Sequence, residues 1–361
     1  MGHSVDPMFH RVYVEQIMTM PLSRERLDEL LGQVSGKRIL VVGDAMLDVY
    51  LKGDVDRISP EAPVPVVRVR ERTHALGGAA NVAQNVAALG ATCDLVAAVG
   101  ADRAAETLRS MLLELGAGDG SLVTVSRCTT QKTRILARAQ QLVRVDEEED
   151  ADLSATDATA LLERVRQGMA HADAVVMEDY NKGVLTADVI AEVLSLAATR
   201  SLPVVVDPKY RNFFAFRGAT IFKPNRRELE AALGAALDVN EPASLPAVLH
   251  RLGVANLLLT LGEHGMVLFS ERGEIVRVPT VARQVYDVVG AGDTVTAYLA
   301  AVLAAGGTAA EAAVIANVAA GIEVGKLGAA TVTTEEVVAY VNSHDLLPQS
   351  QSSAKRHAAP I

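Results

Sequence analysis

The chain has 361 residues and a formal net charge of −10, and half of its residues are hydrophobic. This balance argues against nucleic-acid binding as the main function, because such proteins concentrate Lys and Arg on one face. Cys93 and Cys128 lack the CxxC spacing of zinc sites, so we expect free thiols in a reducing cytoplasm. No apolar run reaches about 18 residues without a charge, so we expect no membrane span.

We expect one folded domain over residues 21–345, between a disordered extension (1–20) and a disordered tail (346–361). The first predicted element is a helix over Ser23–Val34, with Ser23 as its N-cap. Apolar runs then predict strands at Arg38–Val42, Asp94–Val99, Ala174–Met177, Pro203–Val206, Ala219–Phe222 and Leu257–Leu261. Helical patterns lie between them at Ala79–Leu89, Ala104–Leu115, Ala155–Met169, Thr186–Ala198, Arg227–Leu233 and Leu245–Leu252, and again at Gly290–Leu303, Ala309–Gly325 and Thr334–Asn342.

This alternation predicts an α/β fold with a mostly parallel central sheet and helices on both faces. Ligands in such sheets bind at the carboxyl ends of the strands. Lys182 and Lys209 both follow predicted strand ends, where they could contact an anionic ligand. Asp207 also follows a strand, and the sequence leaves open whether it is a turn residue or contacts substrate or metal.

Two stretches lack a helical period and read as antiparallel strands, within residues 49–75 and 129–146. Because helices already close the core, we expect these strands to form a small separate sheet over the strand carboxyl ends. This lid carries the cations Lys132, Arg134 and Arg138. Its apolar face should cover a site, pair with another copy of the chain, or both. The acidic run Glu147–Asp150 is interpreted as a solvated turn.

The segment Asp287–Thr294, with the sequence DVVGAGDT, carries the strongest chemical signal. Gly290, Ala291 and Gly292 leave their amides open to a ligand at the start of a helix, which favours an anion. Asp293 beside that anion site would be costly unless it acts as a general base. The alternative, a glycine-rich turn with Asp293 as a helix N-cap, is equally compatible with the residues. The spacing matches neither the dinucleotide fingerprint nor a P-loop.

Together with four further segments, this element resembles the signatures of the ribokinase (PfkB) family of sugar kinases. The segments are GDAMLD from Gly43, GGAANVA from Gly77, NRRE from Asn225 and TLGEHG from Thr260. Val289 departs from the family, which usually has Thr there. The resemblance implies a ribokinase-like three-layer fold with a β-sheet lid, a kinase activity, and ATP and Mg²⁺ as cofactors.

The resemblance also implies roles for individual residues. The catalytic group is Asp293 with the anion hole Gly290, Ala291 and Gly292. The implied substrate-binding residues are Asp44, Asp48, Gly77, Gly78, Asn81, Arg138, Asp179, Asn181, Lys182 and Lys209. The implied nucleotide-binding residues are Asn225, Glu228, Thr260, Gly262, Gly265 and Asn317, and Asn225 and Glu228 would order the metal through water.

Several segments resemble one branch of the family more closely, namely kinases that phosphorylate D-glycero-β-D-manno-heptose 7-phosphate at O1 in ADP-heptose and lipopolysaccharide synthesis. They are RISPEAPVPVV from Arg57, QQLVRVD from Gln140, DYNKG from Asp179, DPK from Asp207 and VYDV from Val285. The resemblance implies a cytoplasmic, stand-alone kinase that forms a homodimer through the lid. The alternatives are a kinase for another sugar or sugar phosphate and, more remotely, a ligand sensor without catalysis or a nicotinamide oxidoreductase.

Overall fold

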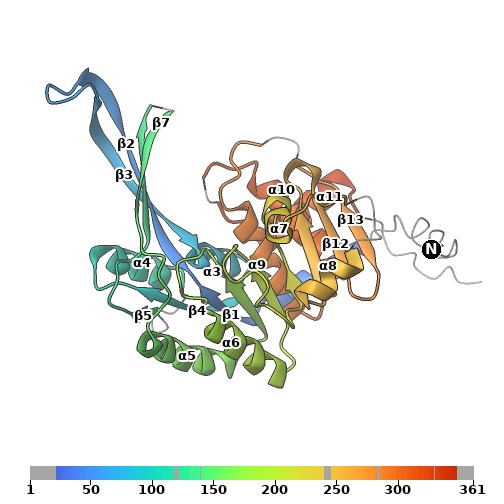
Figure 1. Ribbon diagram of the computed structural model, residues 1–361. Helices are drawn as coiled ribbons and strands as arrows, with labels where there is room; N and C mark the ends of the chain where they lie inside the picture. The colour runs from blue at the N-terminus through green and yellow to red at the C-terminus, as the bar shows by residue number, and fades with distance from the viewer. Residues whose placement is uncertain are drawn as a thin grey trace, which may run out of the picture.

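A computed structural model of the chain describes residues 22–117, 122–138, 140–239, 245–282, 285–328 and 330–347 (Figure 1). The predicted extension over residues 1–20, and the predicted tail from residue 348 onward, lie outside the described residues. Leu347, which lies within the predicted tail (346–361), is instead buried, and its carbonyl accepts a hydrogen bond from Arg24.

Nine strands form the central sheet, in the order β13-β12-β11-β10-β9-β8-β1-β4-β5. All neighbours are parallel except at β12, which is antiparallel to both of its partners. Side chains alternate between the two faces of a strand, so Ile39 and Val41 of β1 enter one core cluster, while Leu40 and Val42 enter the other. The strands are β1 (Arg38–Gly43), β4 (Thr92–Val99), β5 (Leu122–Thr124), β8 (Ala174–Glu178), β9 (Val204–Asp207), β10 (Ile221–Phe222), β11 (Asn256–Thr260), β12 (Met266–Ser270) and β13 (Ile275–Val278).

Helices cover both faces, which confirms the predicted α/β class. One face carries α2 (Arg24–Val34), α3 (Ala79–Ala88), α4 (Arg103–Glu114), α9 (Ala291–Ala304), α10 (Ala309–Glu323) and α11 (Thr334–His344). The other carries α5 (Ala155–Met169), α6 (Ala187–Thr199), α7 (Arg226–Leu233) and α8 (Leu245–Leu252). Among the described residues, no helix is long and apolar enough to span a bilayer.

The strands β5, β12 and β13 were not predicted. The hairpin β12–β13 forms one edge of the sheet, directly after a short 3₁₀ turn at Gly262–His264. One face of the hairpin is covered by α10, which packs against both strands, and the other face of β12 packs against α8. The burial of the hairpin therefore depends in part on a helix that follows about thirty residues later in the chain.

Four strands form the separate lid sheet, in the order β3-β2-β6-β7, and Figure 1 shows them standing off the body of the molecule. They are β2 (Ala45–Ile58), β3 (Pro65–Gly78), β6 (Gln131–Ala137) and β7 (Gln140–Glu147). The predicted lid sheet is thus confirmed, but its strands are not all antiparallel, because β2 pairs in parallel with β6. The strands β2 and β3 are also longer than expected. β2 begins at Ala45, directly after β1, and β3 ends at Gly78, directly before α3. The lid is therefore joined to the body of the molecule without an intervening loop at these two points.

Strand register divides the lid sheet into a polar and an apolar face. Paired residues share a face, and the polar face carries the row Asp48, Lys132 and Asp146 and the row Tyr50, Arg134 and Arg144. The opposite face carries the row Val49, Thr133 and Val145 and the row Leu51, Ile135 and Val143. Val143 and Val145 are almost half exposed on this apolar face.

Candidate active site

Four ionisable side chains meet where the central strands end. Glu178 ends β8, Asp207 ends β9, and Lys223 directly follows β10. Glu178 and Asp207 are register partners, and the amide of Lys223 donates to the carbonyl of Val206. The three side chains therefore stand in a row on the sheet face that α9 covers. The first turn of α9 adds Asp293, and one oxygen each of Glu178, Asp207 and Asp293 lie within 4.8 Å of one another.

Asp293 is buried and held by two donors. Its Oδ2 accepts a hydrogen bond of 2.6 Å from Nδ2 of Asn81, and its Oδ1 accepts one of 3.1 Å from the hydroxyl of Tyr180. Burial raises the pKa of Asp293 to about 6 and the charge of Asp207 adds to the rise, while Asn81, Lys223 and Tyr180 oppose it. The N-cap of α9 is Gly290, not Asp293. The N-cap interpretation of Asp293 is therefore wrong, and its carboxylate is turned into the site.

The predicted anion site lies at the start of α9. Gly290 has a φ of +96°, a left-handed conformation that suits glycine, and Gly292 is exposed. The ammonium of the buried Lys223 lies 3.7 Å from the position that a Cβ on Gly292 would take. Oδ2 of Asp207, which pairs with this ammonium, lies 3.8 Å from the same position. The helix start and the Lys223 ammonium are thus the groups here that favour a phosphoryl group.

A chain of buried amides orients Asn81. The hydroxyl of Thr294 donates to Oδ1 of Asn85 at 3.0 Å. Nδ2 of Asn85 donates to the backbone carbonyl of Asn81 at 2.9 Å and to its side-chain Oδ1 at 3.4 Å. With this support, Nδ2 of Asn81 points at Asp293. Residues from α3 and α9, about 210 positions apart in the chain, thereby form one hydrogen-bonded unit.

Gly77 and Gly78 form the turn from the lid into α3. Gly78 has a φ of +57°, and a Cβ there would overlap the carbonyl oxygen of Asp44. A Cβ on Gly77 would lie 3.0 Å from Oδ2 of Asp48. The other oxygen of Asp48 accepts a hydrogen bond of 2.5 Å from Arg134 of the lid. The structure thus brings Gly77, Gly78 and Asp48 together beside the polar face of the lid.

Asp44 is buried and accepts hydrogen bonds from three backbone amides of one loop. Its Oδ2 accepts from the amides of Tyr180 and Lys182, at 2.8 and 3.0 Å, and its Oδ1 accepts from the amide of Val184 at 3.2 Å. Burial raises its pKa, and these three amides counteract the rise. The side chain is 1 % exposed. Asp44 therefore holds the loop after β8 in place, and this loop in turn presents Tyr180 to Asp293.

The same loop carries Asp179 and Asn181, both buried. Asp179 accepts from the amides of Asn181 and Lys209, at 2.7 and 3.4 Å, and burial raises its pKa to about 6. Oδ1 of Asn181 accepts from the amide of Arg211 at 3.2 Å. These side chains tie the loop after β8 to the loop after β9.

Both lysines predicted at strand ends are paired with acids. Nζ of Lys182 lies 2.8 Å from Glu148, which also accepts from Lys132 at 2.7 Å. Nζ of Lys209 lies 2.6 Å from Glu228 and 5.1 Å from the ring centre of Tyr180. The interpretation of residues 147–150 as a solvated acidic turn is thus wrong for Glu148, because it joins the lid to the loop after β8.

The NRRE segment forms a capping box at the start of α7. Oδ1 of Asn225 accepts from the amide of Glu228 at 2.9 Å, and Oε2 of Glu228 accepts from the amide of Asn225 at 2.8 Å. With Oε1 of Glu228 on Lys209, each of these oxygens already has a donor. Asn225 forms a parallel bridge with Thr260, which joins NRRE to the turn that contains Gly262 and Gly265.

Two predicted site residues lie apart from this group. Arg138 is exposed at the turn between β6 and β7, six residues beyond Lys132 along the lid. Asn317 is buried in α10, where its Nδ2 donates to the carbonyl of Pro279 at 2.8 Å. In this structure Arg138 contacts none of the other predicted site residues, and Asn317 positions the chain after β13.

Glu178, Tyr180, Lys223 and Asn85 are site residues that the sequence analysis missed. Glu178 and Lys223 stand at the ends of predicted strands, as do Lys182 and Lys209, so the strand-end rule could have identified them. Tyr180 lies within the DYNKG segment, but its contact with Asp293 depends on the loop conformation that Asp44 holds. The hydrogen bonds of Asn85 have no signal in the sequence.

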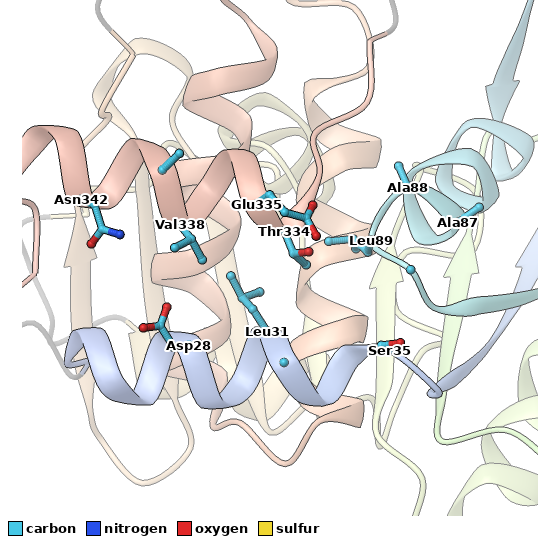
Figure 2. Close-up of a pocket in the computed structure, with 13 residues that line it drawn as sticks. Asp28, Leu31, Ser35, Ala87, Ala88, Leu89, Thr334, Glu335, Val338 and Asn342 are labelled. Atoms are coloured by element: carbon cyan, nitrogen blue, oxygen red, sulfur yellow. The ribbon is translucent and has the colours of Figure 1, made fainter.

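A separate cavity of about 720 Å³ lies between α2, the end of α3 and α11 (Figure 2). Its lining includes Leu31, Leu89, Thr334 and Val338. Because the end of α3 leads into β4, this cavity lies toward the amino ends of the strands. None of the predicted site residues line it.

Comparisons with known proteins show what this chain is similar to. The family described as pfkB family carbohydrate kinase matches residues 37–336. The chain is 43 % identical over 323 residues to the bifunctional protein HldE of Rhodospirillum rubrum, a match over 89 % of this chain and 65 % of that protein. It is 44 % identical over 330 residues to the bifunctional protein HldE of Caulobacter vibrioides, over 90 % of this chain and 68 % of that protein. The chain thus spans about two thirds of the length of these relatives.

Among solved structures, the ribokinase of Arabidopsis thaliana complexed with ribose and ATP matches with a TM-score of 0.67 and 21 % identity. The match covers 85 % of this chain and 99 % of that chain. It shows that the fold is ribokinase-like, as predicted.

Proposed function

The chain belongs to the pfkB family of carbohydrate kinases, and we propose that it transfers the γ-phosphoryl group of ATP to O1 of D-glycero-β-D-manno-heptose 7-phosphate. The observation that carries the chemistry is the buried Asp293, which lies at the start of α9 beside the exposed amide end of that helix. The choice of sugar rests on the DYNKG, DPK and lid segments and on the similarity to the HldE proteins. The cytoplasmic location and the place in ADP-heptose synthesis are part of the same proposal.

In the proposed reaction Asp293 accepts the proton of the O1 hydroxyl as this oxygen attacks the γ-phosphorus. The new O1–P bond forms, the bond from phosphorus to the bridging oxygen breaks, and ADP leaves. The amides of Gly290–Gly292 and the ammonium of Lys223 stabilise the negative charge on the phosphoryl group in transfer. Tyr180 and Asn81 hold the carboxylate of Asp293 in place, so little reorganisation is needed during the step.

The sugar is proposed to lie against Gly77, Gly78 and Asp48, under the polar face of the lid. Lys182 and Lys209 would contact its 7-phosphate by exchanging their carboxylate partners Glu148 and Glu228 for the phosphate. Nucleotide is proposed to lie along the turn from Thr260 to Gly265. Magnesium neutralises charge on the phosphates when it is bound, and Asn225 and Glu228 could hold it only through water, because their oxygens already accept hydrogen bonds.

The substrate is tested by measuring ADP formation from Mg·ATP with four acceptors: heptose 7-phosphate, unphosphorylated heptose, ribose and fructose 6-phosphate. We expect turnover to be fastest with heptose 7-phosphate by at least ~10²-fold in kcat/KM, because a site built around charged groups rejects an acceptor that leaves them unpaired. Faster turnover with another acceptor would overturn the choice of sugar and leave the kinase chemistry standing. The absence of ADP formation with every acceptor would contradict the catalytic proposal.

We also propose that two copies of the chain pair through the apolar face of the lid. Val143 and Val145 are 48 % and 45 % exposed on this face, and burying them would remove apolar surface from water. We expect Val143→Asp to convert a dimer into a monomer, as measured by light scattering on a sizing column. The matched control is Leu113→Asp, since Leu113 is an equally exposed side chain of α4. A dimer that survives Val143→Asp, or a wild-type chain that is monomeric, contradicts the proposed pairing.

A further inference from the structure

Glu148 joins the lid to the body of the molecule through two lysines. It directly follows β7, and each oxygen of its carboxylate holds one ammonium group. Oε2 lies 2.7 Å from Nζ of Lys132, and Oε1 lies 2.8 Å from Nζ of Lys182. Lys132 belongs to β6 of the lid, whereas Lys182 lies in the loop after β8. Two cations from distant parts of the chain thus converge on a single carboxylate.

Both lysine side chains are largely buried, 14 % and 15 % exposed. Lysines usually keep their charged ends in water, so two ammonium groups that are turned inward together require an anion between them. Burial by itself raises the pKa of Glu148, but the hydrogen bonds from Lys132 and Lys182 lower it by more, so its pKa lies below the usual range. The lysine pair therefore forms an anion site that Glu148 fills in the ligand-free chain.

The other charges around Lys132 do not satisfy this site. Nζ of Lys132 also lies 3.1 Å from Asp146, but both oxygens of Asp146 accept from Arg144, at 2.9 and 3.0 Å. Among the described residues, Glu148 is the acid that pairs with Lys182. Without Glu148 the group would hold three cations and one acid, which leaves two positive charges.

The lysine pair borders the predicted sugar site. Lys132 is the register partner of Asp48, whose Oδ2 lies 3.0 Å from the position of a Cβ on Gly77. The amide of Lys182 donates to Asp44 at 3.0 Å, and the carbonyl oxygen of Asp44 lies against the turn Gly77–Gly78. Each lysine is therefore one residue removed from this turn, on opposite sides of the boundary between the lid and the body.

We propose that Lys132 and Lys182 form one binding site for a phosphate monoester, and that Glu148 occupies this site until the phosphate displaces it. A phosphate monoester carries close to two negative charges at neutral pH, and it offers three strong acceptor oxygens. It can therefore hold both ammonium groups, as the two oxygens of Glu148 do, and it balances the remaining charge. The bound phosphate would then join the lid to the loop after β8 in place of Glu148.

The inference rests on the proposed function for the identity of the ligand, the 7-phosphate of the sugar. It assigns to that phosphate a lid residue, Lys132, and a carboxylate that competes with it. Lys209 differs from Lys182, because its partner Glu228 is also fixed in the capping box of α7. The anion site is tested without ATP or sugar, so its failure and the failure of the kinase proposal are separate results.

The experiment is a calorimetric titration of the full chain with inorganic phosphate, at low ionic strength. We expect Glu148→Gln to bind phosphate ~3–10-fold more tightly than the wild type, because the competing charge is lost while the shape of the side chain is kept. Lys132→Met and Lys182→Met should each bind at least ~10-fold more weakly, since each loses a charged donor. In the kinase assay, Glu148→Gln should lower KM for heptose 7-phosphate by a similar factor and leave KM for unphosphorylated heptose unchanged.

The matched control is Glu147→Gln. Glu147 is the neighbouring acid in the chain, but it is exposed and pairs with Gln131 rather than with a lysine. We expect wild-type affinity for phosphate from this variant. Equal affinity in the wild type and all three site variants overturns the proposal, because the phosphate would then bind elsewhere, such as the start of α9. Weaker binding in Glu148→Gln, or no binding in either that variant or the wild type, also overturns it.

Discussion

Replacing Asp293 with asparagine is expected to lower kcat by ~10²–10⁴-fold or more, because the amide cannot take the proton from the attacking hydroxyl. The variant should still fold, since Asn is isosteric with Asp and removes one of three neighbouring buried carboxylates. The amides of Gly290–Gly292 and the turn from Thr260 to Gly265 are untouched, so affinity for ATP should be retained. Steady-state ADP release gives kcat, and fluorescence titration with a nucleotide analogue gives the affinity.

The matched control for this prediction is Asp188→Asn. Asp188 also lies in the first turn of a helix, α6, but it is exposed and belongs to none of the contacts described for the site. We expect wild-type kcat from this variant. Turnover of Asp293→Asn close to that of the wild type would remove Asp293 from the mechanism, and the buried carboxylate would then need a purely structural explanation.

Replacing Lys223 with methionine is expected to destabilise the folded chain strongly. Its side chain is 4 % exposed and pairs with Asp207, so the variant would leave three buried carboxylates without their internal cation. Breaking a buried ion pair by removing one partner typically costs about 3–5 kcal/mol. For a chain of this size we expect a fall in melting temperature of roughly 5–10 °C, measured in EDTA so that no metal compensates.

Two further variants make this second prediction specific. Lys326→Met removes a lysine from the more exposed pair with Glu336 and should cost no more than about 1 kcal/mol. The double variant Lys223→Met with Asp207→Asn should recover part of the lost stability, because both charges of the pair are then absent. An unchanged melting temperature in Lys223→Met would show that the charge of Lys223 does not hold the group together.

Most helices and central strands could be predicted from the sequence alone, but the edge strands β5, β12 and β13 could not. Residues that recur with helical or strand periodicity sit close together in the chain, so α5 and α8 have the predicted bounds. The N-cap of α2 is Ser23, as expected. The start of α9 beside Gly290 was predictable for the same reason, because the glycines, the helix start and Asp293 are neighbours in sequence. The ribokinase-like fold and the kinase class followed from several such local segments in order.

Which groups of the candidate site face each other depends on contacts between distant parts of the chain. Glu178 and Asp207 become neighbours through the parallel register of β8 and β9, and Asp293 joins them because α9 crosses those strand ends. The same packing directs Asp44 to three loop amides rather than toward an open pocket. The sequence alone does not show whether the carboxylate of an Asp or Glu residue is paired, unpaired or solvated. Its burial and its partners depend on strand order and register, which contacts between distant residues set.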